Sequence, residues 1–255
     1  MSHRIAIVED QPDERRVLKS RLTDRGFTVD AYGDRSRARA DFLSGLVPDL
    51  AVLDINLNRN DPTDRGGFDL CREMGGIPAT ARVPVIFLTG IEDHQTELHG
   101  LTLAHDYVRK PIPVSLLVAR IHNLLDWNRR LRDDSSGGSG GSSEDYPVIE
   151  CGELRVDRNS NRAPWKGEDL KLTYNEFEIL HALAEKRGNV AFYDDLFLLL
   201  GTHEISKNTI ATHIKNIRRK FKNIDEDLPP GGVIESVPGI GYRWKTPPDN
   251  EDEDS

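Results

Sequence analysis

The chain has 255 residues, of which 37% are hydrophobic and 30% charged, a composition that excludes a disordered protein and leaves room for two folded domains. Its apolar runs, such as Val83–Leu88, are far shorter than a membrane span, and the first residues contain no export signal, so we expect a cytoplasmic protein without a membrane partner. The net charge of −9 does not exclude nucleic acid as a partner, because residues 1–132 carry 19 basic and 19 acidic side chains and residues 146–248 carry 15 of each.

Composition divides the chain into two predicted domains and two polar segments. Residues 135–143 read SSGGSGGSS, which cannot bury apolar surface, and we expect a flexible coil there within an acidic linker at residues 133–145. The tail at residues 249–255 is polar and acidic, and we expect it to be disordered. The two domains are therefore predicted at residues 1–132 and 146–248.

Short apolar runs alternate with helical patterns in the first predicted domain. The runs predict strands at Ile5–Val8, Val29–Tyr32, Leu50–Leu53, Val85–Leu88 and Tyr107–Val108. The helical patterns are at Asp13–Arg25, Arg35–Leu43, Phe68–Met74, Asp93–Leu103 and Val114–Leu131. Because strands that alternate with helices need right-handed crossovers, this order predicts an α/β fold with a doubly wound, five-stranded parallel sheet. Functional groups in such sheets gather at the carboxyl ends of the strands.

The second predicted domain has a different pattern. Four short strands, expected to form an antiparallel sheet, are predicted at Val148–Glu150, Leu154–Val156, Ala163–Lys166 and Leu170–Leu172. A capping box at Thr173–Glu176 begins a helix, a second helix is expected at Tyr193–Leu200, and a third at residues 206–223. The stretch Val233–Trp244 has the composition of a hairpin. Three helices followed by a hairpin predict an α+β winged-helix domain.

Polar residues stand at the ends of the first, third and fourth predicted strands of the first domain and just after the fifth. They are Glu9, Asp10, Asp54, Thr89 and Lys110. One aspartate at a strand end is more often a turn or a helix cap, but five polar residues in register are hard to explain as caps. Carboxylates that converge in one crevice repel each other unless a proton or a hard cation such as Mg²⁺ compensates. A lysine and a hydroxyl can bind phosphoryl oxygens, so the pattern predicts an aspartyl-phosphate site with Asp54 as nucleophile.

The segments IAIVEDQ, LAVLDINL, VIFLTG and DYVRKPI resemble the receiver domain of bacterial response regulators over residues 3–127. The resemblance implies the strand order 2-1-3-4-5 and phosphorylation of Asp54 by a sensor histidine kinase. It also implies that Asp10 and Asp54 ligate Mg²⁺, that Glu9 acts through water, and that the backbone carbonyl of Asn56 completes the shell. The only enzymatic activity it implies is Mg²⁺-dependent self-phosphorylation and autodephosphorylation at Asp54.

The resemblance also assigns switch and interface residues. Thr89 and Lys110 are expected to bind the phosphate, and Tyr107 is the aromatic side chain that turns inward on activation. Lys110-Pro111 resembles the family's cis peptide, whereas the loop Leu57–Phe68 is several residues longer than usual.

Residues of the family's dimer interface are matched only in part. Asp106 and Arg120 match a pair that relatives use when two phosphorylated receivers form a homodimer. Leu116 stands where relatives tend to carry an acid that pairs across the same interface.

A basic segment in the second domain predicts contact with DNA. Residues 207–222 hold six basic side chains and no acid, and Ile210, Ile214, Ile217 and Phe221 form an inward face at helical spacing. A helix that is basic on its exposed side fits the major groove, although many charged faces are only solvated. The candidate contacts are Lys207, Thr209, Thr212, His213, Lys215, Asn216, Arg218, Arg219 and Lys222, with Arg243 from the hairpin. We expect Lys215, Arg218 and Lys222 to contact phosphates, and Thr212, His213 and Arg219 to lie near base edges.

The segments LKLTYNEFEILHAL, NTIATHIKNIRRKF and ESVPGIGYRW resemble, in this order, the effector domain of OmpR/PhoB winged-helix regulators over about residues 146–246. The resemblance implies that Lys207–Asn223 is the recognition helix, that Gly239–Trp244 belongs to the wing, and that Leu198–Ser206 contacts RNA polymerase. Pro238 stands where relatives often have a minor-groove arginine. Within the family the chain is similar to ChvI-like and sortase-associated regulators.

Three alternatives remain open from the sequence. The first is a phosphorylation-independent regulator whose receiver only dimerises, which the presence of Asp54, Thr89 and Lys110 disfavours. The second is a protein-binding adaptor, which the basicity of the third helix disfavours. The third is a phosphatase-like enzyme, for which no site for an external substrate stands out.

Overall fold

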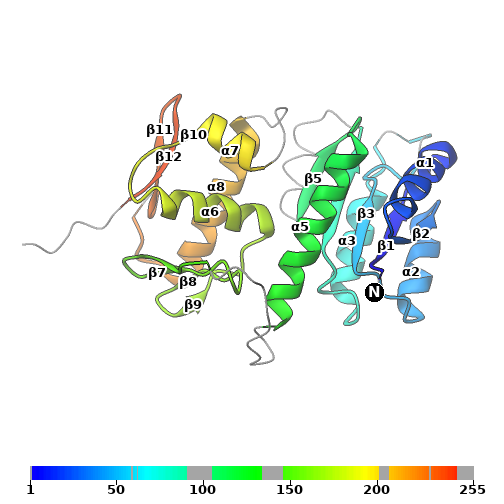
Figure 1. The fold of residues 1–255 in the computed structure, drawn as a ribbon, viewed down its shortest axis with the longest axis horizontal. Coiled ribbons are helices and arrows are strands. Elements are labelled where there is room, and N and C mark those ends of the chain that lie inside the picture. Colours follow the sequence, from blue (N-terminus) through cyan, green and yellow to red (C-terminus); the bar gives the residue numbers. More distant parts are fainter. Residues whose placement is uncertain are drawn as a thin grey trace, which may run out of the picture. The chain divides into compact units, whose positions relative to one another are not determined.

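The computed structural model describes residues 2–58, 60–61, 63–90, 105–133, 146–200, 207–229 and 231–245, without the side chains of Thr89 and Asp133. The chain divides into two compact units, Met1–Asn128 and Arg129–Ser255 (Figure 1). The predicted helix Asp93–Leu103, most of the linker and the acidic tail lie outside the described residues. In the part of the chain that is described, no helix is both long and apolar enough to cross a membrane.

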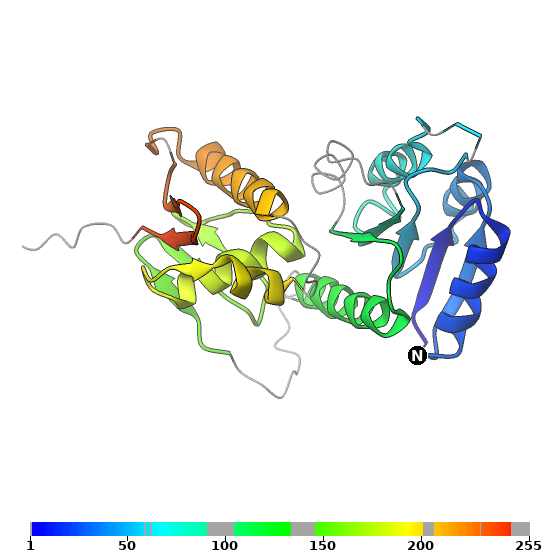
Figure 2. The same ribbon diagram turned by 90° about the horizontal axis from the view of Figure 1, so that it is seen from above.

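The first unit contains the predicted five-stranded parallel sheet, in the order β2-β1-β3-β4-β5. Its strands are β1 (Arg4–Val8), β2 (Thr28–Tyr32), β3 (Leu50–Leu53), β4 (Val85–Thr89) and β5 (Asp106–Arg109). Its helices are α1 (Pro12–Thr23), α2 (Arg35–Leu43), α3 (Gly66–Gly76) and α5 (Val114–Asp133), the last of which runs past the boundary of the unit. Among these helices α2 and α3 cover one face of the sheet, and α1 and α5 cover the other (Figure 2).

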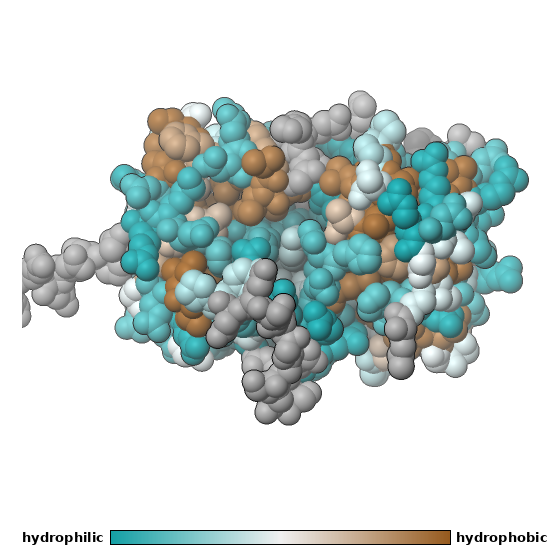
Figure 3. Space-filling view, viewed as in Figure 1, coloured by the Kyte–Doolittle hydropathy of each residue, from teal (hydrophilic) through white to brown (hydrophobic). Residues whose placement is uncertain are grey.

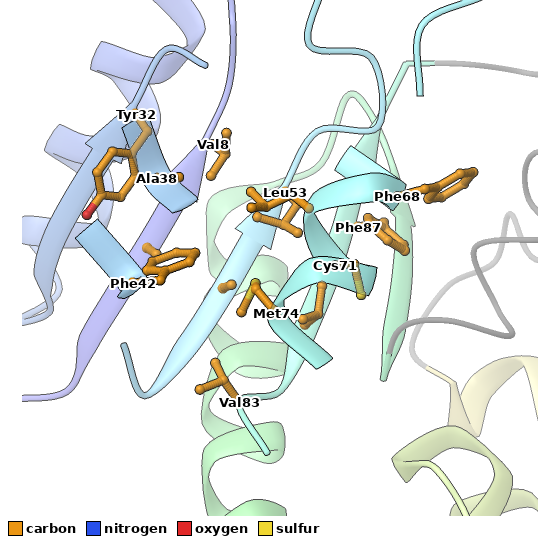
Figure 4. Close-up of a cluster of buried hydrophobic side chains, with 14 of the residues drawn as sticks. Val8, Tyr32, Ala38, Phe42, Leu53, Phe68, Cys71, Met74, Val83 and Phe87 are labelled. Atoms are coloured by element: carbon orange, nitrogen blue, oxygen red, sulfur yellow. The ribbon is translucent and has the colours of Figure 1, made fainter. Parts of the chain in front are cut away.

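Apolar side chains between the sheet and helices α2 and α3 form the core on that face (Figure 4). Phe68 of α3 meets Phe87 of β4 edge to face, with ring centroids 4.8 Å apart. Leu53, Phe87 and Met74 are fully or almost fully buried, as expected for strands that are covered on both sides. This packing fixes α3 directly beyond the end of β3.

The register of the strands brings the predicted polar residues to one edge of the sheet. Val8 pairs with Leu53, so the residues that follow them, Glu9 and Asp54, lie at neighbouring strand ends. Backbone hydrogen bonds continue past the strands, because Asp54 N donates to Val8 O at 2.9 Å and Glu9 N donates to Tyr32 O at 3.0 Å. The site therefore begins where regular pairing ends.

The second unit has the predicted winged-helix elements. One sheet contains β6 (Ile149–Cys151), β7 (Leu154–Val156), β8 (Pro164–Trp165) and β9 (Glu168–Asp169). The helices are α6 (Tyr174–Glu185), α7 (Tyr193–Leu199) and α8 (Lys207–Ile224). A second sheet, in the order β10-β12-β11, contains β10 (Ala191–Phe192), β11 (Ile234–Val237) and β12 (Gly241–Trp244).

Two strands of this unit differ from the prediction. The fourth strand is Glu168–Asp169 and not Leu170–Leu172, because the tight turn at Lys166 and Gly167 pairs Trp165 directly with Glu168. Lys171 has a φ of +49°, which ends extended backbone at this point. The strand β10 was not predicted, because two residues carry too little periodicity to be recognised.

The packing of the second unit follows the predicted inward face of α8. Ile210, Ile214 and Ile217 have no exposed area, and Phe221 is 1% exposed. The Phe221 ring packs against two tryptophan rings, with centroids 5.2 Å from Trp165 and 5.8 Å from Trp244. The capping box at Thr173 and Glu176 is present at the start of α6, as predicted. Strand β8, helix α8 and the β10–β12 sheet thus share one aromatic core.

Candidate phosphorylation site and DNA-binding surface

Lys110 lies at the centre of the predicted acidic site. Its Nζ is 2.5 Å from Glu9 Oε2 and 2.6 Å from Asp54 Oδ2. A third carboxylate, Glu14 Oε2 on the first turn of α1, lies 2.8 Å from the same nitrogen. Lys110 precedes a cis peptide bond with Pro111, as predicted. The structure therefore brings together three of the predicted residues and adds one that was not predicted.

Burial dominates the ionisation of this cluster. It raises the pKa of Glu9 to about 7 and also raises that of Asp54, although Lys110 opposes both shifts. For Lys110 burial acts the other way, but the carboxylates of Asp54 and Glu9 outweigh it, so the pKa is raised. Three carboxylates share one ammonium group, and negative charge remains in excess. A further cation is favoured at such a place.

Backbone contacts hold the acidic residues in position. Gln11 N donates to Glu9 Oε1 at 3.1 Å, and Asn56 N donates to Asp54 Oδ1 at 3.2 Å. Arg15 Nη1 donates to the backbone oxygens of Glu9 at 2.6 Å and Asp10 at 3.2 Å, a contact that sequence reasoning missed. Helical spacing could have predicted this contact of Arg15, because a residue in the first turn of α1 faces back toward the strand end.

A cavity of about 700 Å³ opens beside this cluster, and Asp10, Asp54, Asn56 and Lys110 line it. The carboxylates of Asp10 and Asp54 and the backbone carbonyl of Asn56 offer oxygen atoms there, which is the donor set that suits Mg²⁺. In the described part of the chain, no three carboxylate, imidazole or thiol groups already form a metal-binding cluster.

The two predicted switch residues have different outcomes. Thr89 ends β4, beside Arg109 of β5, but its side chain lies outside the described residues. Tyr107 is half-buried and packs against the core cluster. Its movement on activation stays a prediction.

The expected dimer contacts Asp106 and Arg120 are instead paired within the chain. Arg120 Nη1 donates to Asp106 Oδ2 at 2.5 Å, and the two residues are only 8% and 3% exposed, respectively. Asp106 Oδ1 also accepts the backbone N–H of Tyr107 at 2.8 Å. Both charges are therefore paired within the chain in this structure, and the assignment of Asp106 and Arg120 to an intermolecular interface stays a prediction.

Helix α8 buries more of its surface than predicted. Thr209, His213 and Asn216 are only 4%, 2% and 4% exposed, so their assignment as DNA contacts is wrong for this conformation. The physical reason is that α8 packs against both α6 and α7, which widens its buried face beyond the isoleucine stripe.

The outward side of α8 is a single stripe at helical spacing. We call it the exposed stripe, and it consists of Asn208, Ala211, Lys215, Arg219 and Lys222. Three of these residues were predicted as DNA contacts, whereas Asn208 and Ala211 were missed. Spacing from Lys215 in steps of three or four would have found both.

Three further predicted contacts are engaged within the domain. Arg218 donates to the backbone oxygen of Ile234 at 2.8 Å and to Ser236 Oγ at 3.1 Å, so it links α8 to β11. Arg243 Nε donates to Glu235 Oε2 at 2.6 Å. Lys207 Nζ lies 4.9 Å from the centre of the Tyr193 ring.

A basic pocket of about 460 Å³ lies beside the exposed stripe, between α8 and the loop that leads to β11. Its charged lining is Lys215, Arg218, Arg219 and Lys222, and Gly231 and Gly232 complete it. The pocket concentrates positive charge at the surface of α8, as expected for a helix that approaches a phosphate backbone.

A doubly wound α/β unit with an acidic, lysine-containing strand edge, followed by a winged helix with an exposed basic stripe, defines a response regulator with a DNA-binding output domain. The comparisons with known proteins agree. The family model of the response regulator receiver domain matches residues 5–122, and the model of the transcriptional regulatory protein C-terminal domain matches residues 167–244.

Curated relatives extend over both domains. The chain is 30% identical to the phosphate regulon transcriptional regulatory protein PhoB of Rhizobium meliloti, covering 96% of this chain and 100% of that protein. It is 31% identical to the transcriptional regulatory protein CreB of Escherichia coli, covering 94% and 96%. A solved structure of a RitR mutant shares the fold, with a TM-score of 0.59, 21% identity and coverage of 96% and 100%.

The chain therefore belongs to the OmpR/PhoB family of response regulators. It is a phosphorylation-dependent transcription regulator with a receiver domain and a DNA-binding winged-helix domain, and both a sensor kinase and DNA are its implied partners. No finding supports the finer similarity to ChvI-like or sortase-associated members, so it stays a prediction.

Proposed function

We propose that Asp54 is the phosphoacceptor of this regulator. The observation that carries the proposal is the position of Lys110 Nζ, 2.6 Å from Asp54 Oδ2 and 2.5 Å from Glu9 Oε2. Asp54 attacks the phosphorus atom of the donor, the bond to the leaving group breaks, and the phosphoryl group stays on the aspartate. Lys110 then supplies a positive charge to the phosphoryl oxygens, which lowers the energy of the transition state.

The donor set around Asp54 fits Mg²⁺. Asp10 and Asp54 would bind the ion directly, Glu9 through water, and Asn56 through its backbone carbonyl. Bound there, Mg²⁺ neutralises charge on the carboxylates and on the phosphoryl oxygens. The residues of the chain contribute orientation, because backbone N–H groups already fix the Glu9 and Asp54 carboxylates. Beyond self-phosphorylation and autodephosphorylation with Mg²⁺, we propose no enzymatic activity.

We further propose that the exposed stripe of α8 enters the major groove of double-stranded DNA. Lys215, Arg219 and Lys222 are exposed and bring three charges to it, while Asn208 offers an amide that can pair with a base edge. Arg243 holds Glu235 through Nε, and other N–H groups of its guanidinium are proposed to contact the DNA backbone. A DNA partner requires the compartment that holds the chromosome, which supports the cytoplasmic location.

RNA polymerase is the proposed protein partner of the effector domain. Apolar side chains are exposed around α7 and the β10–β12 sheet (Figure 3), and Leu198, near the end of α7, is 70% exposed. The remainder of the predicted contact loop, residues 201–206, lies outside the described residues. Together with the exposed Phe192 and Ile240, this leucine supports a protein contact there.

The phosphoacceptor is tested with acetyl phosphate as a small donor. The full chain should gain one phosphoryl group in mass spectrometry when Mg²⁺ is present and none after chelation with EDTA. Asp54→Asn should abolish the gain. Labelling that survives the substitution, or that ignores chelation, contradicts the proposal.

A further inference from the structure

The ammonium group of Lys110 has its three donors in use. A protonated lysine offers three N–H bonds, and those of Lys110 point to Glu9, Asp54 and Glu14 at 2.5, 2.6 and 2.8 Å. A phosphoryl oxygen can therefore reach this nitrogen only if one carboxylate leaves it.

The three carboxylates differ in how firmly they are held. Asp54 is the acceptor itself, and Glu9 has a side chain only 1% exposed that also accepts the Gln11 N–H. The Glu14 side chain is 41% exposed and reaches the cluster from α1. Since its carboxylate is already partly hydrated, the contact of Glu14 with Lys110 is the most screened of the three, and water can replace the ammonium group when Glu14 turns away.

We propose that Glu14 is a positioning residue that occupies the third donor of Lys110 at rest and is exchanged for a phosphoryl oxygen when a phosphodonor binds. The proposal rests on the proposed phosphorylation of Asp54. In the exchange one carboxylate–ammonium hydrogen bond breaks and one phosphoryl–ammonium hydrogen bond forms.

The exchange makes Glu14 a determinant of donor specificity. A small dianionic donor enters a cavity lined by Asp10, Glu14 and Asp54, and it must displace one negative group with another. It has few other contacts that could offset the lost ion pair. A donor carried by a protein gains binding energy over a larger surface, so Glu14 disfavours small-molecule phosphodonors relative to protein donors.

The test compares phosphorylation kinetics of full-length variants with acetyl phosphate at saturating Mg²⁺. Glu14→Gln should lower the apparent KM for acetyl phosphate about fivefold, a moderate change because the contact is partly exposed, and leave the maximal rate unchanged. Asp13→Asn is the matched control, because it removes the same charge from the adjacent position but its side chain is 88% exposed and pairs with Arg16. Asp13→Asn should leave KM unchanged.

A second variant separates contact from charge. Glu14→Asp keeps the charge but shortens the side chain, so it should lower KM nearly as much as Glu14→Gln. An unchanged KM in Glu14→Gln, or an equal decrease in Asp13→Asn, overturns the proposal while labelling at Asp54 persists. Labelling that does not depend on Asp54 overturns the proposed function instead. Thermal unfolding of each variant verifies that the receiver is folded.

Discussion

At the scale of single residues, Gly67 sets the distance between α3 and the phosphorylation site. A Cβ atom at this position would lie 2.0 Å from the backbone oxygen of Asp54, a distance that no side chain can accept. Gly67 N also donates to Ile55 O at 3.0 Å, so α3 begins in direct contact with the residues that follow β3. Any side chain there must push the Asp54 segment out of position.

We expect Gly67→Ala to destabilise the receiver by about 1–3 kcal/mol, the usual range for overpacking. Gly75→Ala is the control in the same helix, because a Cβ there meets nothing within 4 Å. That change should instead stabilise the receiver, by about 0.5–1 kcal/mol, because alanine is the better helix former. Hydrogen exchange of the β3 and α3 amides measures both effects, and equal protection in the two variants would contradict the assignment.

Each charged residue of the exposed stripe of α8 should contribute separately to DNA binding. Lys215→Ala should weaken binding to all DNA sequences and reduce the slope of log K against log salt by about one, because one phosphate contact is lost. Lys166→Ala is the control, since Lys166 lies in the β8–β9 turn and pairs with Asp225 at 2.7 Å. The slope of log K against log salt for Lys166→Ala should match that of the unaltered protein. A slope unchanged by Lys215→Ala in a binding titration would show that the stripe does not face the DNA.

At the scale of elements, helix α8 shows what the sequence could and could not predict. The stripe of Ile210, Ile214 and Ile217 was predicted, because apolar residues at helical spacing identify the side of a helix that faces a core. The burial of His213 and Asn216 was not, since it depends on the neighbours α6 and α7. A polar residue beside an apolar stripe is buried only when a second element packs there, and the periodicity of one helix carries no such information.

The strand-end site could be predicted, because it depends on the topology of the sheet and not on the packing of neighbouring helices. Parallel topology alone places the residues after β1 and β3 side by side, so Glu9 and Asp54 could be joined without knowledge of any side-chain contact. The contact of Glu14 with Lys110 was missed, because it depends on how the first turn of α1 packs over the strand ends.

Arg218 connects two elements of the DNA-binding domain, and this gives a prediction at the same scale. Its Nε and Nη2 atoms both donate to the Ile234 oxygen, at 3.2 and 2.8 Å. Arg218→Lys keeps the charge but loses this paired contact, so it should destabilise the second unit by about 1 kcal/mol. Arg219→Lys, on the exposed stripe, should not. Hydrogen exchange of the β11 amides compares the two variants, and equal protection would rule out the link.

At the scale of the whole molecule, the sequence predicted two domains but assigned a role to Asp106 and Arg120 that the structure does not support. Charge complementarity in a sequence does not tell whether two residues pair within one chain or between two chains. In this structure the two side chains are only 3% and 8% exposed and pair with each other within the chain. If two receivers associate, they must use other surfaces or open this pair.

The last prediction concerns how phosphorylation at Asp54 reaches the DNA-binding domain. The nine residues 135–143 are glycine and serine, a composition that transmits no rigid motion, so we propose that phosphorylation acts by pairing two receivers. Pairing raises the effective concentration of the second winged helix near its half-site, which strengthens binding without a new DNA contact. Half-sites should then be direct repeats about one DNA turn apart.

In sedimentation and footprinting, the phosphorylated protein should be dimeric on such DNA and Asp54→Asn should not. Because Asp106 and Arg120 are paired within the chain, Arg120→Ala should unfold or loosen the receiver rather than selectively abolish pairing. A phosphorylated protein that stays monomeric, both free and on DNA with two half-sites, would exclude pairing and leave release of a contact between the domains as the mechanism.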